Sequence, residues 1–302
     1  MEKQNLRAEV IDNRFLNAVS ETLECTVIAE GFRFLEGPVW HEVQKKLYFS
    51  DIPGNAIYSW SEAEGVKLYR QNSYLANGNS IDDKGRIITC EHGTSRVTMT
   101  EPDGTYIVLV DAYNGMALNS PNDVVVKSDG SIYFTDPNPG RCSRVGIPRP
   151  QKLPFQGVYR LNMKNGELTL LADDFLKPNG LCFSLDESKL FVNDTDRGHI
   201  RVFDVAHDGT LKNGMIWTIL TGNGPGVADG MKITEDGLLW CAGPRGIHVF
   251  DETGRSIGII HIPEVAANFA WGGDDMRTLY IAATSKLIQL KTLSKGIIRK
   301  RR

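Results

Sequence analysis

Six short segments of the sequence each carry an oxygen-bearing side chain followed by a short apolar run. These residues are separated by 41, 45, 57, 50 and 39 positions, and they are Glu36, Asn77, Asn122, Asn179, Asp229 and Asn268. If they were brought to one point, their carboxylate and amide oxygens would bind a hard cation. One such Asn alone would be interpreted as a local cap of a strand or turn. Six aligned positions favour a shared site.

The residue types also predict which cation this is. Oxygen ligands, with no Cys and no obvious His among them, favour Ca²⁺, Mg²⁺ or Mn²⁺ over Zn²⁺. The amide carbonyls of Asn favour Ca²⁺, which takes roughly six to eight oxygens in loose geometry. Carboxylates confined together repel each other, and a cation relieves that repulsion. We therefore expect one divalent cation, with Ca²⁺ preferred and Mg²⁺, Mn²⁺ or Zn²⁺ as the other options.

The segments around the six residues predict strands rather than helices. Short runs rich in Val, Ile, Tyr and Phe alternate with turn sequences such as DDKG (82–85), KSDG (127–130) and TEDG (234–237). Such turns close hairpins because Gly accepts a positive φ without strain. Repeats of about 40 to 50 residues with four strands each are typical of propeller blades. We predict an all-β fold, a six-bladed β-propeller with four-stranded blades whose first strands line a central channel.

The two ends of the chain predict how this ring closes. The last repeat, ending at 285–293, supplies only three strands. The segment LECTVIAE (23–30) is expected to supply the fourth and so remove the open sheet edge. The predicted organisation is an N-terminal arm over 1–20, a single propeller domain over 21–294 and a basic tail over 295–302.

Several motifs together resemble the senescence-marker-protein/gluconolactonase/luciferin-regenerating family of six-bladed propellers, over about residues 25–290. They are LEGPVW (35–40), ANGNSIDDKGRI (76–87), NSPNDVVVKSDGSIYFTDP (119–137), PNGLCFS (178–184) and ADGMKITEDG (228–237). The resemblance implies a single divalent cation in the channel and hydrolysis of sugar lactones.

The resemblance also implies roles for individual residues. Glu36, Asn179 and Asp229 would be metal ligands, Asn122 a further ligand or a substrate contact, and Asp229 the proton acceptor and donor. This agrees with the chemistry of a lactone, because its hydrolysis passes through an oxyanion that a cation stabilises while a carboxylate takes the water proton.

Further contacts are expected around this centre. His92, in the segment CEHG, is predicted to be a second acid/base or a hydroxyl-binding group, with a backbone-bonded loop histidine as the alternative. Asn77 and Asn268, two of the six regularly spaced residues, are expected to bind the substrate.

The sequence departs from the family pattern beside the third repeat. Some members carry Arg two residues before the Asn equivalent to Asn122, where this chain has Ser120. Gluconolactonase-like sequences often read FTDPPYG where this chain reads FTDPNPG (134–140). Arg141 or Arg144 is expected to replace the missing aromatic rim residue. Both belong to a long Pro- and Arg-rich loop (138–156), which we predict to form a lid or rim, with a plain surface insertion as the alternative.

Composition excludes several partners. With 34 Lys+Arg against 37 Asp+Glu the net charge is −3, which argues against a basic face for nucleic acid. No apolar run reaches the length of about 18 residues that a membrane span needs, and the N-terminus does not resemble a signal peptide. The five cysteines are far apart, with no CxxC pair, which favours a reducing cytoplasm.

The predicted partner is therefore a small sugar lactone, bound by a monomer or homodimer. Two other functions stay open: a phosphotriesterase-like metal hydrolase of the same fold, and a non-catalytic propeller that binds a partner on its rim. No G-x-S-x-G elbow is present, which argues against a serine esterase.

Overall fold

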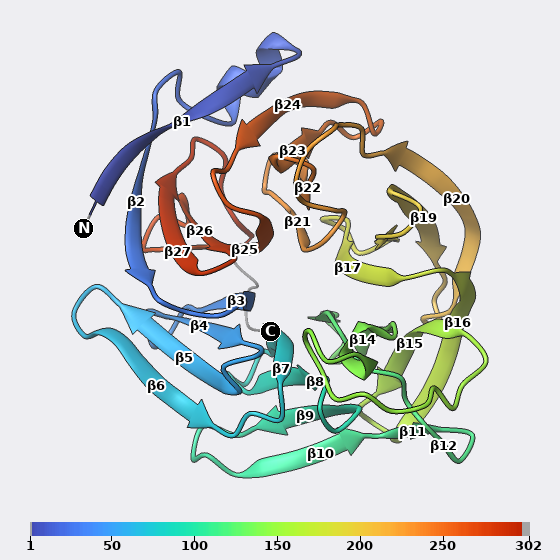
Figure 1. Cartoon of the computed structure of the whole chain (residues 1–302). Coiled ribbons are helices and arrows are strands. Elements are labelled where there is room, and N and C mark those ends of the chain that lie inside the picture. The colour runs from blue at the N-terminus through green and yellow to red at the C-terminus, as the bar shows by residue number, and fades with distance from the viewer. Residues whose placement is uncertain (1, 298–302) are drawn as a thin grey trace.

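The computed structural model describes residues 2–297, which are almost entirely strands, turns and loops (Figure 1). The helical segments in this range are two short 3₁₀ turns, η1 (Asn13–Asn17) and η2 (Pro139–Arg141). The predicted all-β class is confirmed. No helix in residues 2–297 is long and apolar enough to cross a membrane.

Four four-stranded antiparallel sheets make up the middle of the chain, and in each the strand order follows the sequence. The first contains β3 (Leu35–His41), β4 (Lys46–Asp51), β5 (Ala56–Ser61) and β6 (Gly65–Gln71). The second contains β7 (Ala76–Ile81), β8 (Ile87–Glu91), β9 (Arg96–Thr100) and β10 (Tyr106–Val110). The third contains β13 (Val124–Val126), β14 (Ile132–Asp136), β15 (Gln156–Asn162) and β16 (Glu167–Phe175). The fourth contains β17 (Pro178–Phe183), β18 (Lys189–Asp194), β19 (His199–Val205) and β20 (Leu211–Ile219).

A nine-stranded sheet joins the two ends of the chain, in the order β21-β22-β23-β24-β1-β2-β27-β26-β25. Its C-terminal strands are β21 (Met231–Ile233), β22 (Leu239–Gly243), β23 (Gly246–Phe250), β24 (Ser256–His261), β25 (Ala266–Gly272), β26 (Thr278–Ala283) and β27 (Lys286–Lys291). Its N-terminal strands are β1 (Glu2–Val10) and β2 (Leu23–Glu30). A small hairpin, β11 (Ala112–Tyr113) with β12 (Met116–Ala117), lies outside these sheets.

The sheets are arranged around a central axis, as in a β-propeller (Figure 1). The first strand of each repeat, such as β7, β17, β21 and β25, lies toward the centre, while β6, β10, β20 and β24 follow the periphery. Apolar side chains fill the space between neighbouring sheets. Tyr133 and Phe183, for example, pack edge to face at 4.9 Å between ring centroids, from β14 and β17.

The N-terminal residues are packed into this arrangement. β1 pairs with β2 along one part of its length and with β24 along another. Strand β2 in turn pairs with β27, in the register Cys25↔Leu290. Phe15 in η1 is fully buried, and its ring occupies the place that a side chain on Gly258 would fill. Of the predicted basic tail, residues 298–302 lie outside the described range.

Buried aspartates at the ends of second strands position the polypeptide that enters each centre-facing strand. Asp136, at the end of β14, accepts hydrogen bonds from the backbone N–H groups of Asn119 and Ser120, both at 2.7 Å. Asp51 and Asp194 bond in the same way to the segments before β3 and β17. These bonds hold the loops that precede Glu36, Asn122 and Asn179.

Candidate functional site

The six residues singled out by their spacing lie one after another around the centre, and we call them the ring. Four of them, Glu36, Asn77, Asn179 and Asp229, are directly followed by a glycine that packs against the next ring residue. A Cβ on Gly37 would lie 2.1 Å from the carbonyl oxygen of Asn77, and one on Gly78 would lie 2.5 Å from that of Asn122. Only glycine permits such close approach of two strands.

The other half of the ring repeats this packing and closes it. A Cβ on Gly180 would lie 2.2 Å from the carbonyl oxygen of Asp229, and one on Gly230 would lie 2.1 Å from Cγ of Asn268. Thr135, whose carbonyl accepts from the Asn122 N–H at 2.8 Å, donates its hydroxyl to the Asn179 carbonyl at 2.8 Å. Asn268 donates through Nδ2 to Oε2 of Glu36 at 3.0 Å. The chain therefore brings all six residues together.

The two carboxylates of the ring share one environment. Glu36 is buried and Asp229 is half-buried. Loss of solvent raises the pKa of Asp229, and repulsion by Glu36 and Asp123 raises that pKa further. Burial, followed by repulsion from Asp123, likewise raises the pKa of Glu36. Negative charge is thus concentrated where water stabilises it poorly.

Asp123 and Lys232 belong to this centre although the sequence analysis did not single them out. Asp123 is 3% exposed, and its Oδ2 has no hydrogen-bond partner within residues 2–297. Burial raises the pKa of Asp123, and the charge of Lys232 opposes that rise. Lys232 also donates through Nζ to Oδ1 of Asn268 at 3.2 Å.

The signals for these two residues were present but indirect. Asp123 directly follows Asn122, and strict alternation along a strand would have turned it to the opposite side. Residues 121–123 precede β13 and are not in regular strand conformation, so alternation does not apply there. Lys232 lies three residues after Asp229 in a short strand.

The ring amides differ in how many hydrogen bonds they already form within the protein. Asn268 donates to Glu36 and accepts from Lys232 and from the Phe269 N–H, at 2.9 Å for the latter. Asn179 donates through Nδ2 to the Thr195 hydroxyl at 3.0 Å, and its hydrogen bonding to Asp229 partly opposes the rise in the pKa of that carboxyl. Contacts of Asn122, Asn77 and Asn268 with a substrate stay predictions.

A divalent cation fits this donor set. The oxygens are all hard ligands, the carboxylates are held together against their repulsion, and the buried Oδ2 of Asp123 lacks a donor. In the described part of the chain no three residues of the types His, Cys, Asp and Glu are grouped as a metal site. A cation would therefore depend on amide oxygens as well as on Glu36 and Asp229.

His92 lies beside the ring and bonds to one of its members. Its Nε2 is 3.0 Å from Nδ2 of Asn77, and its Nδ1 is 2.9 Å from the carbonyl oxygen of Val145. Burial lowers the pKa of His92 to about 4, with a smaller contribution from the charge of Arg149. The imidazole is therefore neutral near pH 7.

Comparison with known proteins follows the same motifs. The model of the SMP-30/gluconolactonase/LRE-like region matches residues 34–285. The chain belongs to this family. A gluconolactonase of Zymomonas mobilis is 30% identical, with 89% of this chain and 82% of that protein covered.

Solved structures of the family agree in fold. A gluconolactonase structure from Xanthomonas campestris is 31% identical with a TM-score of 0.88, covering 96% of this chain and 95% of the other. A structure of regucalcin from Agrobacterium tumefaciens, described as a calcium-binding protein, is 17% identical with a TM-score of 0.75 and covers 90% and 95%. The predicted family resemblance is confirmed.

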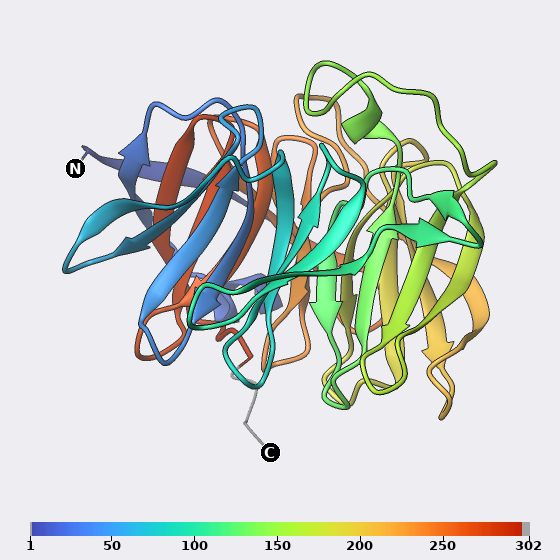
Figure 2. The same cartoon turned by 90° about the horizontal axis from the view of Figure 1, so that it is seen from below.

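The long loop of this family member connects β14 to β15 and rises above the sheets on one face (Figure 2, green, upper right). Arg141 donates through Nε to the Asn119 carbonyl at 2.9 Å, through Nη2 to that of Leu118 at 2.6 Å, and through Nη1 to that of Pro150. In this structure Arg141 anchors the loop, and its contact with a substrate stays a prediction.

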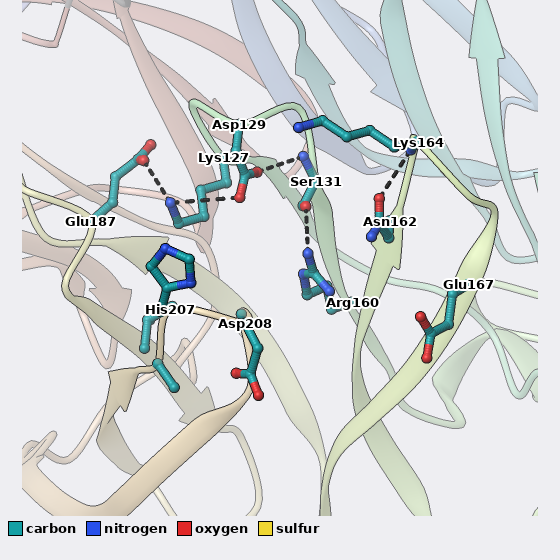
Figure 3. Close-up of a pocket in the computed structure, with 13 residues that line it drawn as sticks. Lys127, Asp129, Ser131, Arg160, Asn162, Lys164, Glu167, Glu187, His207 and Asp208 are labelled. Carbon is teal, nitrogen blue, oxygen red and sulfur yellow. Dashed lines mark hydrogen bonds and ion pairs between the residues drawn. The ribbon is translucent and has the colours of Figure 1, made fainter.

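A separate polar hollow of about 710 Å³ lies between the third and fourth sheets (Figure 3). Its lining comes from the turns β13–β14, β15–β16, β17–β18 and β19–β20, at the opposite strand ends from the ring. Lys127 forms ion pairs there with Glu187 at 3.2 Å and with Asp129 at 3.8 Å, and Arg160 donates to the Ser131 hydroxyl at 3.1 Å (Figure 3). None of the predicted site residues lines it.

Proposed function

We propose that this protein is a lactonase that opens sugar lactones to aldonic acids with the help of one divalent cation, Ca²⁺ by preference. The observation that carries the proposal is the pair Glu36 and Asp229, held together in a ring of amides, where burial and repulsion from neighbouring carboxylates raise the pKa of both groups. Glu36, Asn122, Asn179 and Asp229 would hold the cation. The named activities of the relatives support the substrate class.

The ring residues divide the chemistry. When bound, the cation supplies Lewis-acid stabilisation of the oxyanion that forms on the lactone carbonyl oxygen. Asp229, half-buried, accepts the proton of the attacking water. The ester C–O bond of the lactone then breaks, and Asp229 returns the proton to the oxygen that leaves, which becomes a hydroxyl of the opened sugar acid. Asn77, Asn122, Asn268 and Arg141 orient the sugar hydroxyls.

We further propose that the sheets form six blades in one domain over 21–294. Pairing of β2 with β27 supports β2 as the closing strand of the last blade, and β1 with η1 then forms the arm over 1–20 that links two blades at the periphery. All five cysteines are free, which supports a reducing compartment such as the cytoplasm. The protein would act as a monomer or homodimer.

The test is acid release from D-glucono-1,5-lactone with and without a chelator, corrected for uncatalysed opening in an enzyme-free blank. We expect turnover that a chelator abolishes and that added Ca²⁺ restores. Turnover that survives complete chelation overturns the cation's role. If the cation-loaded protein opens no aldonolactone, the lactonase proposal fails, and a phosphotriester substrate then becomes the next assay.

A further inference from the structure

A chain of hydrogen bonds runs from the long loop to the ring. The carbonyl oxygen of Val145, in the loop, lies 2.9 Å from Nδ1 of His92, and Nε2 of the same imidazole lies 3.0 Å from Nδ2 of Asn77. His92 and Asn77 are 1% and 3% exposed. Solvent therefore does not compete for these bonds.

The bonding partners decide the tautomer of His92. A carbonyl oxygen can only accept, so Nδ1 must carry the proton that faces Val145. A neutral imidazole then has a lone pair on Nε2, which can only accept. The group of Asn77 that faces Nε2 must accordingly be its NH₂, which fixes the direction of the whole amide.

This orientation leaves one atom of Asn77 without a partner. Its Oδ1 is buried and accepts no hydrogen bond from residues 2–297. Leaving a buried acceptor unsatisfied costs free energy, so such an atom indicates a donor that a ligand supplies. Asn77 is a ring neighbour of both Glu36 and Asn122 through the glycine contacts. A ligand at the ring centre lies next to this residue.

We propose that His92 is a positioning residue that holds the amide of Asn77 with Oδ1 free to accept a hydrogen bond from a substrate hydroxyl. The inference rests on the proposed lactonase function and specifies its substrate class as polyhydroxylated lactones. Both nitrogens of the neutral His92 imidazole are hydrogen-bonded, to Asn77 and to Val145, so the imidazole has no proton to exchange with the substrate. The structure therefore favours positioning over the acid–base role that the sequence predicts for His92.

The loop holds the imidazole from its other side as well. A Cβ on Gly140 would lie 2.6 Å from Cγ of His92, so η2 packs directly against the imidazole of His92. Arg149 donates to the His92 carbonyl and to the Ser95 hydroxyl, the latter at 2.7 Å. The loop thus contributes to substrate choice by fixing Asn77 through His92.

The first test reads the tautomer directly. In ¹⁵N-labelled protein we expect His92 to show a protonated Nδ1 and an unprotonated Nε2 throughout pH 5.5 to 8, in the cation-loaded form without substrate. Asn77→Ala should shift the Nε2 resonance. A protonated Nε2 at neutral pH overturns the inference, whether or not the protein opens lactones.

The second test compares two lactones, D-glucono-1,5-lactone and δ-valerolactone, which lacks hydroxyl groups. Asn77→Ala and His92→Phe should each lower kcat/KM for the glucono-lactone by about 10- to 100-fold and change that for δ-valerolactone by less than about threefold. His92→Gln, whose amide oxygen can still accept from Asn77, should retain most of the glucono-lactone activity.

These outcomes separate the two claims. Equal losses on both lactones in His92→Phe, with the melting temperature lowered, would indicate a structural role and overturn the inference alone. Wild-type protein that opens neither lactone overturns the proposed function itself. Loss of glucono-lactone activity in His92→Gln equal to that in His92→Phe also contradicts the positioning role.

Discussion

Two polar regions of the molecule look alike in composition and differ in balance. The ring and the hollow between the third and fourth sheets both gather acidic and amide side chains at strand ends. In the hollow, Lys127 pairs with Glu187 and Asp129, and the charge of Arg160 also helps to lower the pKa of Asp129. At the ring, the charge of Lys232 acts on Glu36 and on the neighbouring Asp123, and both of these carboxylates repel Asp229. Buried carboxylates whose charge the protein does not compensate, rather than the size of a hollow, distinguish the ring.

Folding shifts the pKa of a glutamate carboxyl in opposite directions in the two regions. Burial raises the pKa of Glu36, and repulsion by Asp123 raises it further. At Glu187 burial also acts to raise the pKa, but hydrogen bonds from Ser128 and the Lys127 pair outweigh it, and the pKa is lowered. The protein stabilises the charge of Glu187 and leaves that of Glu36 to a ligand.

The largest effect that would break this contrast is expected at Asp229. Asp229→Asn keeps the shape and removes both a proton acceptor and a ligand charge, so turnover should fall by about 10²- to 10⁴-fold. The melting temperature of the chelated protein should not fall, because an ionised Asp229 is poorly solvated in the fold. Initial rates and thermal unfolding measure the two quantities. An unfolded variant would mean that Asp229 is structural.

The next effect is on pH. Because folding raises the pKa values of Glu36 and Asp229, the folded metal-free protein binds more protons than the unfolded chain above the ordinary carboxyl range. Its stability should therefore fall as pH rises, by up to about 1.4 kcal/mol per pH unit for each carboxyl involved. Urea unfolding with chelator between pH 5 and 8 measures this.

The control is the cation-loaded protein, in which a bound positive charge should flatten the dependence. Chelated protein that becomes more stable toward pH 8 would contradict the description of the ring as an unbalanced cluster.

A smaller effect is expected at Lys232, the positive charge of the ring region. Lys232→Met removes a charge that opposes the repulsion around Asp123 and Glu36, so Ca²⁺ should bind more tightly, by roughly fivefold, or about 1 kcal/mol. Titration calorimetry measures it, with Lys232→Arg as the charge-conserving control. Weaker binding in Lys232→Met would show that Lys232 acts mainly by orienting Asn268, to which it donates at 3.2 Å.

Much of this arrangement could be predicted from the sequence, because repetition carries information that single residues lack. Asn179 alone is ambiguous, but its spacing from Asp229 and from Asn122 matches a repeat whose equivalent positions meet. The glycines after the ring residues also have a reason visible only in three dimensions: Gly230 lies where any Cβ would overlap Asn268. The repeat predicts the ring, and the structure explains the glycines.

What the sequence could not predict depends on irregular backbone. Asp123 escapes strand alternation, and Lys232 enters the site from a three-residue strand. Arg141 was predicted to face the substrate, yet whether a loop arginine contacts a sugar or its own backbone depends on how the loop folds. His92 was singled out for its chemistry, and its partner Val145 lies 53 residues away.

The smallest effect is expected in the hollow, and it sharpens the comparison most. Glu187→Gln and Glu36→Gln are the same chemical change in the two regions. Since the pKa of Glu187 is lowered by folding, its charge stabilises the fold above the ordinary value of 4.5, and that contribution is lost as pH falls. Both Glu187 and Lys127 are mostly buried, with side chains 19% and 18% exposed. Glu187→Gln should therefore cost up to about 1 kcal/mol at pH 7 in urea unfolding.

Lactone turnover should respond differently from stability in these two variants: the variant that loses stability should keep its turnover, and the other should lose it. Glu187→Gln should keep kcat/KM within about twofold of wild type, because Lys127 and Ser128 bond to it far from the ring. Glu36→Gln should lose turnover together with Ca²⁺ affinity while the chelated protein gains stability at pH 8, because a buried charge is removed. A loss of turnover in Glu187→Gln at unchanged melting temperature would place function in the hollow too, and the balance of charge would then no longer tell the two regions apart.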